Sequence, residues 1–564
     1  MTETLNPALV LILGGALLPL MPQIVRRWST LALPVLATVV LLLLPFGEYG
    51  QMQMFGYSLV TLRLDRLSFV FALIFHIAAF LTALYAWHVR DTVQQVAALI
   101  YGGAAIGAVL AGDLITLFVF WELTAISSVF LILASGTERA FRASMRYLII
   151  QVGSGVLLLA GAVVKLQATG SLAFEYLGLD SPGGLLIFLA FGIKCAFPLL
   201  HNWLQDAYPE ATVTGTVVLS AFTTKLAVYS LARGYPGTEI LIGIGAVMTA
   251  FPIFYAVIEN DLRRVLAYSL NNQLGFMVVG IGVGTELALN GTTAHAFSHI
   301  LYKALLFMSM GAVLLRAGTI KGSELGGLYK SMPYSAGFCI VGAASISAFP
   351  LFSGFVSKSL ILTAVAAEHH WLVWLVLLFA SAGVFHHSGI KIPYFAFYAH
   401  DSGIRCEEAP TNMLLAMGVT AFLCVAIGIF PGPLYAILPY TVDYEPYTTT
   451  HVITQLQLLM FSALAFTVLM RTGIYPPELR STNLDFDWIY RKLIPNAVYT
   501  GAAWLAACST TLGRSVQTQK LRLINGAYRH LGPSSGINRS PSTGTSVLIL
   551  LTVFALFALI VLTT

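Results

Sequence analysis

The stretch FGIKCAFPLLHNWLQDA, Phe191 to Ala207, decides how the rest of this sequence is interpreted. It lies in a long apolar run, and yet it contains Lys194, Pro198, His201 and Asp206. A lysine in the hydrocarbon layer costs about 3 kcal/mol on insertion scales, so it is retained where it serves a function. Proline removes a backbone donor and disturbs the preceding turn. A broken helix with a buried cation is typical of a transporter that handles an ion near the middle of the membrane. The alternative is that Lys194 lies near a helix end and extends its ammonium to the lipid headgroups.

Composition defines the class of protein. The chain has 564 residues, of which 57% are hydrophobic and 10% charged, whereas soluble domains have about 25% charged residues. We therefore expect an all-α polytopic membrane protein. The net charge of +5 gives no reason to expect a nucleic-acid partner. Five scattered cysteines without a CxxC pair predict neither disulfides nor a metal site. The absence of a phosphate-binding lysine motif argues against nucleotide chemistry, so we expect no cofactor.

Apolar runs long enough to cross about 30 Å of hydrocarbon recur along the chain. The positive charges at the start follow the first run, which predicts an uncleaved helix with its N-terminus outside. About sixteen spans are expected, near residues 7–25, 30–46, 65–88, 95–111, 113–134, 140–165, 183–205, 211–233, 238–258, 264–282, 291–316, 334–352, 372–400, 411–431, 452–470 and 546–562. Residues 356–367 are expected to form a half-helix. The alternating pattern of Met54–Phe69 predicts a short extracytoplasmic hairpin.

Loop charges predict the orientation, since basic residues collect on the cytoplasmic side. One side has Arg26, Arg27, Arg90, Arg139, Arg142, Arg146, Arg263, Arg264, Arg316, Lys321, Lys330 and Arg405. The other has few, which we take to be Arg63, Arg66, Lys165, Arg233 and Lys358. Residues 472–545 mix aromatic, aliphatic and basic side chains, as helices that lie along a membrane surface do. This segment either straps neighbouring subunits on the cytoplasmic face or is a solvated C-terminal elaboration.

A glutamate lies within one of the apolar runs. Glu122, in FVFWELTAISSVF, has no neutralising partner nearby in sequence. A desolvated carboxylate takes up a proton or finds a cation, and Lys194 and Lys225 are the buried cations available. If the distance between Glu122 and a lysine changes, that lysine can switch between holding and releasing a proton. A static structural ion pair is the alternative. Asp113 is expected to cap the helix that carries Glu122.

Two further clusters lie in the second half of the chain. His295, His299 and Lys303 recur every four residues, so they share one helix face. A lysine as the third member argues against a metal, whereas the row suits proton relay through water. The fourth cluster, VFHHSGIKIPYFAFY, places Lys391 just before Pro393, as Lys194 precedes Pro198. Two lysines on broken helices about 200 residues apart suggest an internal duplication, in which each half has its own site. The neighbouring His386 and His387 either connect Lys391 to bulk water or lie at the interface.

Seven segments in this order together resemble a known family. They are GDLITLFVFWELTAISS, GIKCAFPLLHNWLQDAYPEA, LSAFTTKLAVYSLAR, NDLRRVLAYSLNNQLGFM, HAFSHILYKALLF, GGLYKSMP and ISAFPLFSGFVSK. They are similar to the antiporter-like subunits of respiratory complex I, membrane-bound hydrogenases and Mrp-type Na+/H+ antiporters, most of all to the Mrp D-type subunit. The resemblance covers about Leu64 to Tyr398. It implies two inverted five-helix repeats, each with a broken helix, a chain of buried water and charge, and a lateral helix after Arg471.

The resemblance also implies residue roles. Glu122 and Lys194 would be the coupled pair, Lys225 a connecting lysine, and Lys391 the terminal lysine. His295, His299 and Lys303 would form the central relay. His201, Asp206, His386 and His387 are expected to be auxiliary to the proton path. The sequence departs from the family pattern at Gln205 and Tyr208, in the segment ATVTGTVV, and at Arg263, all near helix ends.

The expected organisation is six regions: N-terminal helices and hairpin (1–94), a first antiporter repeat (95–235), a second repeat (236–431), an additional span (432–471), the lateral segment (472–545) and a last span (546–564). We expect a multi-pass subunit of the bacterial cytoplasmic membrane that translocates H+, with Na+ as a second candidate ion. Its partners would be other membrane subunits and lipids. One alternative is a subunit that energises a redox, hydrogenase or inorganic-carbon module, without redox cofactors of its own. Another is an ancillary structural subunit.

Overall fold

The computed structural model describes residues 5–54, 56–476, 478–479 and 483–563. Its internal contacts divide the chain into a large unit that ends at Asn483 and a second unit that begins at Leu484. Twelve described helices are long and apolar enough to cross a membrane, and four shorter apolar helices accompany them. The polytopic membrane fold is therefore confirmed, whereas the number of sixteen spans stays a prediction.

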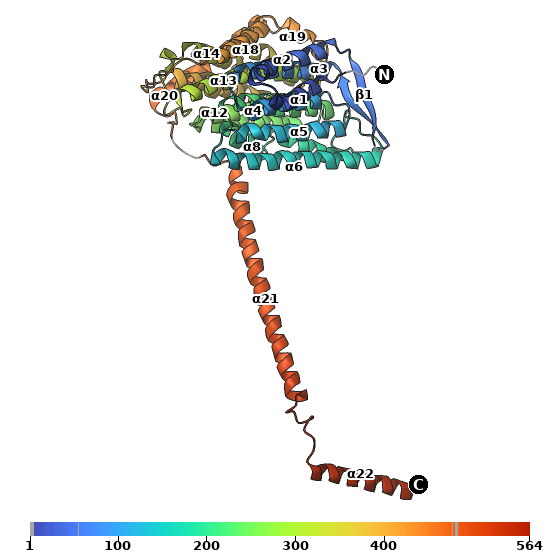
Figure 1. Cartoon of the computed structure of the whole chain (residues 1–564). Coiled ribbons are helices and arrows are strands. Elements are labelled where there is room, and N and C mark those ends of the chain that lie inside the picture. The colour runs from blue at the N-terminus through green and yellow to red at the C-terminus, as the bar shows by residue number, and fades with distance from the viewer. Residues whose placement is uncertain (1–4, 55, 477, 480–482, 564) are drawn as a thin grey trace. The chain divides into compact units, whose positions relative to one another are not determined.

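The N-terminal part of the large unit is helical except for one β-hairpin (Figure 1). Its elements are α1 (Pro7–Leu17), α2 (Gln23–Leu43), β1 (Gly47–Met54), β2 (Tyr57–Leu64) and α3 (Arg66–Tyr85). The two strands pair antiparallel, with Gly47 opposite Leu64. The predicted hairpin is thus present, but it begins before Met54, and α3 already starts at Arg66. Asp65 and Ser68 close this junction with a reciprocal capping box.

The next part contains the first break in a helix. Its helices are α4 (Thr92–Val109), α5 (Leu114–Leu133), α6 (Glu138–Thr169), α7 (Gly184–Lys194), α8 (Asn202–Ala207), α9 (Val213–Ala221) and α10 (Thr223–Gly234). The Asp113 side chain accepts hydrogen bonds from the backbone N–H groups of Ile115 and Thr116, so the predicted cap of α5 is confirmed. The chain between α7 and α8 leaves helical geometry, because Ala196 and Leu199 have φ values of 60° and 71°.

The following part repeats that break. Its helices are α11 (Ile240–Ile258), α12 (Leu262–Val283), α13 (Glu286–Ala317), α14 (Pro333–Ile346), α15 (Ser353–Ala367), α16 (Trp371–Val384), α17 (Lys391–Pro393) and α18 (Thr411–Ile429). Helices α11 and α12 pack closely, since a Cβ added to Gly275 would lie 2.6 Å from the Gly245 carbonyl oxygen. Small residues permit such close helix approach. Helix α15 is the half-helix expected at 356–367.

The two breaks have the same sequence and the same backbone. Ala-Phe-Pro-Leu occurs at Ala196–Leu199 and again at Ala348–Leu351. Ala348 and Leu351 have φ values of 57° and 74°, close to those of the first break. The N–H of Phe197 donates to the carbonyl five residues earlier, and the N–H of Phe349 does the same, both at 3.0 Å. This match supports the interpretation of two repeats that each contain a broken helix.

Two predictions are wrong here. The helix around Lys391 is not the second broken helix: it stays helical, with π-helical turns at Phe385–Ile390 and Tyr394–Tyr398 on either side of α17. A π turn inside an α-helix often marks a functional position. Lys358 was assigned to a loop, but it lies on α15 and is 1% exposed. A charge close to a break in a helix looks like a loop charge when only the sequence is known.

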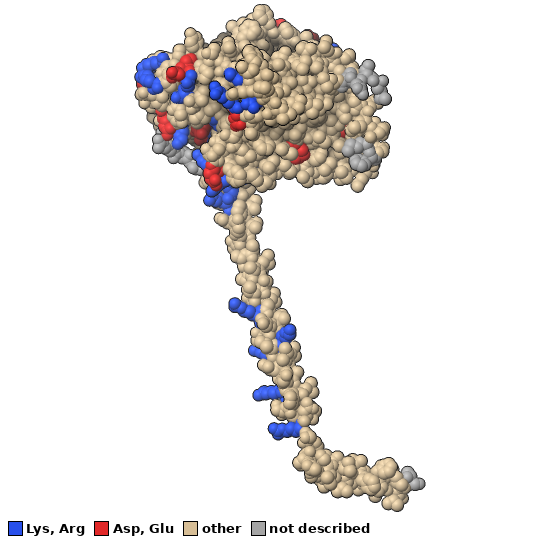
Figure 2. All heavy atoms as spheres, viewed as in Figure 1, with Lys and Arg blue, Asp and Glu red and all other residues tan. Residues whose placement is uncertain are grey.

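The remaining elements are α19 (Gly432–Ala436) and α20 (Thr449–Thr472) in the large unit, and α21 (Ile494–Leu531) and α22 (Thr543–Thr563) in the second. Figure 2 shows few charged side chains over much of the visible surface of the large unit, as expected for a surface that faces lipid. On α21 it shows Lys and Arg without Asp or Glu, in agreement with the sequence. Helix α21 buries none of its side chains. Its assignment as a lateral helix and the six region boundaries stay predictions.

Candidate ion-translocation site

Lys194 lies at the last turn of α7 and is completely buried. Its Nζ donates to the Trp121 carbonyl oxygen at 2.6 Å and to the Thr124 Oγ1 at 2.8 Å, both on α5. The ammonium also lies 4.4 Å from the centre of the Trp121 ring, a distance at which the ring stabilises a cation. Lys194 therefore points into the protein, which excludes the interpretation that it extends to the headgroups.

Glu122 lies beside Lys194 without touching it. The two side chains are near enough to interact electrostatically, but among the described residues they form no ion pair within 4.0 Å. The Oε1 of Glu122 has no hydrogen-bond partner in the described chain. It packs on Gly155 of α6, where an added Cβ would lie 1.4 Å from it. Glu122 and Lys194 are thus neighbours, and their role as a coupled pair stays a prediction.

Three lysines place their ammonium groups at the carbonyl ends of other helices. Lys225 Nζ donates to the Ser220 carbonyl oxygen at the end of α9, at 2.6 Å. Lys358 Nζ donates to the Ile346 carbonyl oxygen at the end of α14, at 2.8 Å. Lys391 Nζ donates to carbonyls at the end of α11. The last turn of a helix leaves carbonyls without intrahelical partners and carries a partial negative charge, so it stabilises a cation.

The α13 row is confirmed as one buried cluster. His295, His299 and Lys303 are each 0% exposed. The rings of His295 and His299 stack with centroids 6.2 Å apart. His295 Nδ1 lies 3.1 Å from the Ser357 Oγ of α15, and its Nε2 lies 3.3 Å from the Tyr302 hydroxyl.

A hydrogen-bonded chain leads from this row to the helix of Lys391. Lys303 Nζ donates to the Ser269 Oγ at 2.9 Å. The Ser388 Oγ donates to the same Ser269 Oγ at 2.8 Å, and His387 Nδ1 lies 2.8 Å from the Ser388 Oγ. His387 is completely buried, and its part in the proton path stays a prediction. Each side chain along this hydrogen-bonded path can both accept and donate a hydrogen bond when it is neutral.

Lys391 has a neighbour that the sequence did not indicate. Its Nζ lies 2.9 Å from the Glu478 Oε1, in an ion pair of two buried side chains. Glu478 belongs to the segment Ile474–Leu479 that follows α20 (with residue 477 outside the described residues). The nearby His386 is half-buried, and its ring packs against Phe466 at 5.1 Å and Tyr475 at 5.4 Å.

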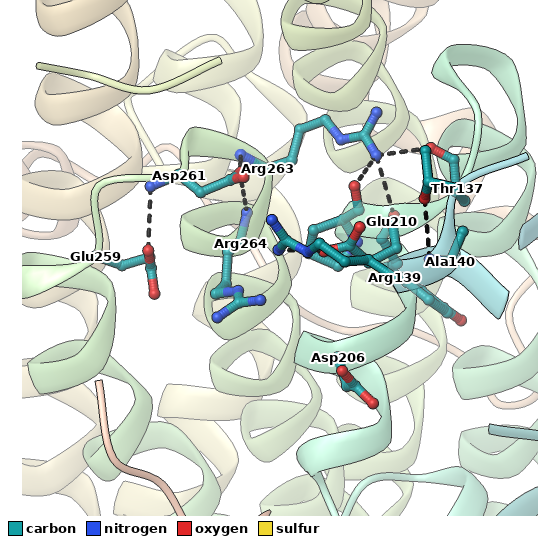
Figure 3. Close-up of polar contacts among 12 residues, drawn as sticks. Thr137, Arg139, Ala140, Asp206, Glu210, Glu259, Asp261, Arg263 and Arg264 are labelled. Carbon is teal, nitrogen blue, oxygen red and sulfur yellow. Dashed lines mark hydrogen bonds and ion pairs between the residues drawn. The ribbon is translucent and has the colours of Figure 1, made fainter. Parts of the chain in front are cut away.

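The auxiliary residues of the first break have structural partners. The Asp206 carboxylate accepts two hydrogen bonds from Arg146, at 2.7 and 3.0 Å. The His201 ring packs against Phe251 at 4.6 Å. Their roles in a proton path stay predictions. Figure 3 shows this end of the large unit, where Arg139 meets Glu210 at 2.6 Å.

Arg263, one of the departures from the family pattern, connects the two halves of the large unit. It is 2% exposed and lies at the start of α12. Its Nη2 donates to the Ala211 carbonyl oxygen at 2.8 Å and to that of Pro209 (Figure 3). A guanidinium presents several donors in a fixed fork, so it suits a cluster of carbonyls. Arg263 therefore holds the turn that follows the first broken helix.

Many polar atoms between these groups are buried and lack a partner among the described residues. They include both nitrogens of His299, both amide atoms of Gln151, Gln205 and Asn271, the Ser298 Oγ, the Thr224 Oγ1 and the Nε2 of His387. Buried polar groups are satisfied in folded proteins, by ordered water where protein partners are absent. These atoms therefore identify positions for internal water along the row from Glu122 to Lys391. The described residues bring together no group of three His, Cys, Asp or Glu that could hold a metal.

Three kinds of functional group were missed by sequence reasoning. Lys358 could have been found, because the repeated Ala-Phe-Pro-Leu marks a second break just before it. Ser269 and Ser388 give no signal, since serines are common in such helices. Glu478 lies in a polar segment and approaches Lys391 only through the tertiary fold.

Buried lysines and histidines, breaks in two helices and sites for water define an integral membrane protein of the ion-translocating class. The comparisons with known proteins agree. Residues 111–385 match the family model described as NADH:quinone oxidoreductase/Mrp antiporter, TM. The chain is 30% identical over 354 residues to the D-type subunit of the Na(+)/H(+) antiporter of Alkalihalophilus pseudofirmus, covering 58% of this chain and 71% of that protein. The chain belongs to this NADH:quinone oxidoreductase/Mrp antiporter family, so the resemblance is confirmed.

Other relatives and solved structures carry the names of different complexes. The chain is 27% identical over 423 residues to hydrogenase-4 component B of Escherichia coli, covering 66% of this chain and 63% of that relative. A chain of the Mrp complex from Dietzia sp. has the same fold, with a TM-score of 0.73 at 23% identity over 99% of this chain and 63% of that one. A chain of the archaeal membrane-bound sulfane sulfur reductase matches over 100% of both chains, with a TM-score of 0.70 at 22% identity.

Proposed function

We propose that this protein is a proton-translocating membrane subunit of a multisubunit complex in the bacterial cytoplasmic membrane. Protons would move along the row formed by Glu122, Lys194, Lys225, the α13 cluster and Lys391, with internal water between them. We add Lys358, which lies in the same row, to these proposed proton-carrying residues. The similarity to a Na(+)/H(+) antiporter subunit supports H+ movement, with or without exchange for Na+.

The observation that carries the proposal is the nature of the acceptors around the lysines. Lys194, Lys225, Lys303 and Lys358 donate to carbonyl or hydroxyl oxygens, and within the described chain none has a carboxylate oxygen within 4.0 Å. A neutral acceptor accepts a hydrogen bond from an amine as well as from an ammonium. A fixed carboxylate would favour the ammonium and hold the proton. Neutral acceptors therefore let each lysine pass through both states.

Transport in inverted membrane vesicles that contain the assembled complex tests the proposal. Lys194→Ala and Glu122→Gln are expected to abolish proton-coupled transport, because one removes a carrier and the other removes the charge that can change its proton affinity. The partly exposed Lys321, paired with Glu324 at 3.8 Å, gives the control Lys321→Gln, which is expected to transport normally. Intact transport in Lys194→Ala and Glu122→Gln, with the complex assembled, contradicts the proposal.

A redox-driven assembly is the second candidate for the complex. It is favoured by the names hydrogenase-4 component B and sulfane sulfur reductase among the similar proteins. In that case the chain itself would still move protons, and a partner module would supply the energy. Purification of the complex under native conditions and identification of its subunits distinguish the two. Iron–sulfur or other redox subunits would favour the second candidate, and Mrp-type subunits alone the first.

A further inference from the structure

The terminal lysine differs from the other buried lysines in its surroundings. Lys391 is the one described lysine of the row with a carboxylate within 4.0 Å of its Nζ, at 2.9 Å. Both side chains are buried, with exposures of 0% and 6%. A full opposite charge at this distance favours the charged form of a lysine more strongly than the carbonyls and hydroxyls around the other four do.

The hydrogen bonds of Lys391 do not require this carboxylate. An ammonium has three donors, and Nζ has three carbonyl acceptors on the end of α11: those of Val257 and Glu259 at 2.7 Å and that of Ala256 at 3.2 Å. The Glu478 oxygens have no well-aligned hydrogen bond within the described residues. Glu478 thus adds charge to a group whose hydrogen bonds are already complete, and its loss would leave no donor of Lys391 unsatisfied.

An aromatic side chain close to Glu478 packs into the core. Tyr475 is 6% exposed and lies among Phe466, Phe395 and His386, with ring centroids 5.3 to 6.4 Å apart. Its backbone N–H donates to the Leu469 carbonyl oxygen at 3.0 Å. Tyr475 thus anchors the chain to the core close to Glu478.

We propose, on the basis of the proposed function, that Glu478 is a positioning residue that acts as a removable counter-ion of Lys391. While Glu478 lies beside it, Lys391 keeps its proton as an ammonium. When Glu478 takes up a proton, the proton on Lys391 leaves Nζ for a water molecule. A neutral amine then remains on the α11 carbonyls. The segment after α20 thereby controls the last proton release of the row.

Other titratable groups near Glu478 set the background for this control. Glu259 interacts electrostatically with both Lys391 and Glu478, and its Oε2 accepts a hydrogen bond from the Asn483 Nδ2 at 3.3 Å. Tyr475 interacts electrostatically with Glu478, and His386 with Lys391. Burial raises the pKa of the Glu478 carboxyl above its ordinary value, and Lys391 opposes that rise.

The test is the pH dependence of proton-coupled transport by the assembled complex in vesicles. Glu478→Gln keeps the shape and removes the charge, so the acid limb of the profile is expected to move to lower pH by about 1 unit or more. Glu478→Asp is expected to lie between this variant and wild type. Tyr475→Ala removes the aromatic anchor close to Glu478, which weakens the placement of the carboxylate, and is expected to shift the profile in the same direction. Glu407→Gln, an exposed carboxylate that pairs with Arg316, is the matched control.

A double-mutant cycle identifies the partner of Glu478. In a Lys391→Gln background, Glu478→Gln is expected to cause no further shift, since residues that act together are not additive. A Glu478→Gln profile that coincides with wild type, or one reduced equally at every pH, overturns the counter-ion role. If Lys194→Ala and Glu122→Gln still abolish transport, the proposed function survives that result. If the wild-type complex moves no protons, both proposals fail.

Discussion

Removing the Ser269 hydroxyl is expected to interrupt the path between the α13 row and the helix of Lys391. This one oxygen accepts from Lys303 Nζ at 2.9 Å and from the Ser388 Oγ at 2.8 Å. Ser269→Ala leaves those two groups roughly two hydrogen-bond lengths apart, with a methyl group between them. Lys303 keeps one direct acceptor, the Leu266 carbonyl oxygen at 3.2 Å.

The magnitude follows from the bonds that are lost. A hydrogen bond to a charged group contributes about 1.5–3 kcal/mol, so the variant is expected to be less stable and still to fold. If the same amount is added to the barrier for proton transfer, transport slows by about 10- to 100-fold, since 1.36 kcal/mol corresponds to a factor of ten. Ser388→Ala removes the next link and is expected to have a similar effect.

The assay is the initial rate of proton-coupled transport in inverted vesicles, normalised to the amount of assembled complex. Ser309→Ala is the matched control, because the Ser309 Oγ is buried on α13 and donates to the Leu305 carbonyl oxygen of its own helix, away from the path. It is expected to transport at close to the wild-type rate. More than half of the wild-type rate in the Ser269→Ala/Ser388→Ala double variant would refute the path.

Three further predictions follow from the surroundings of single residues. Gly155→Ala places a Cβ 1.4 Å from the present position of the Glu122 Oε1, so the carboxylate must move, and transport is expected to fall severalfold; Gly153→Ala, whose Cβ meets nothing within 4 Å, is its control, and equal rates in the two would contradict the reasoning. Lys358→Gln removes a buried cation next to the second break and is expected to reduce proton-coupled transport in vesicles at least tenfold while the complex still assembles. Normal transport by this variant would show that Lys358 has only a structural role. Burial alone would raise the pKa of Asp65, but the bonded Arg233 and the Ser68 N–H lower it overall. The thermal stability contributed by the Asp65–Arg233 pair is therefore expected to be full above about pH 4 and to be lost as the pH falls through the lowered pKa. Asp65→Asn is expected to remove that part of the acid sensitivity of the melting temperature, and an unchanged pH dependence would count against the pair.

Sequence reasoning identified the broken helix at Pro198, the buried Lys194 and the row on α13. These features produce strong local signals: charge in an apolar run, a proline in a helix and a repeat every four residues. The sequence did not indicate which atom each charged side chain contacts. Lys194 donates to the Trp121 carbonyl oxygen and not to Glu122, because the direction of a side chain depends on packing between helices.

The errors have the same origin. Pro393 suggested a second break at Lys391, but a proline can be accommodated next to π-helical turns, and the helix continues. Lys358 was assigned to a loop because it closely follows the real second break. The contact between Lys391 and Glu478 joins residues that are far apart in sequence, across α18 and α20. No periodicity or local motif reports such a contact.

The central claim is that water connects the buried titratable groups, and a density map of the assembled complex at a resolution that shows ordered water tests it most directly. The account predicts water density beside the His299 nitrogens and the amides of Gln151 and Asn271, continuous from Glu122 to Lys391. Dry, close-packed gaps between those side chains would contradict it.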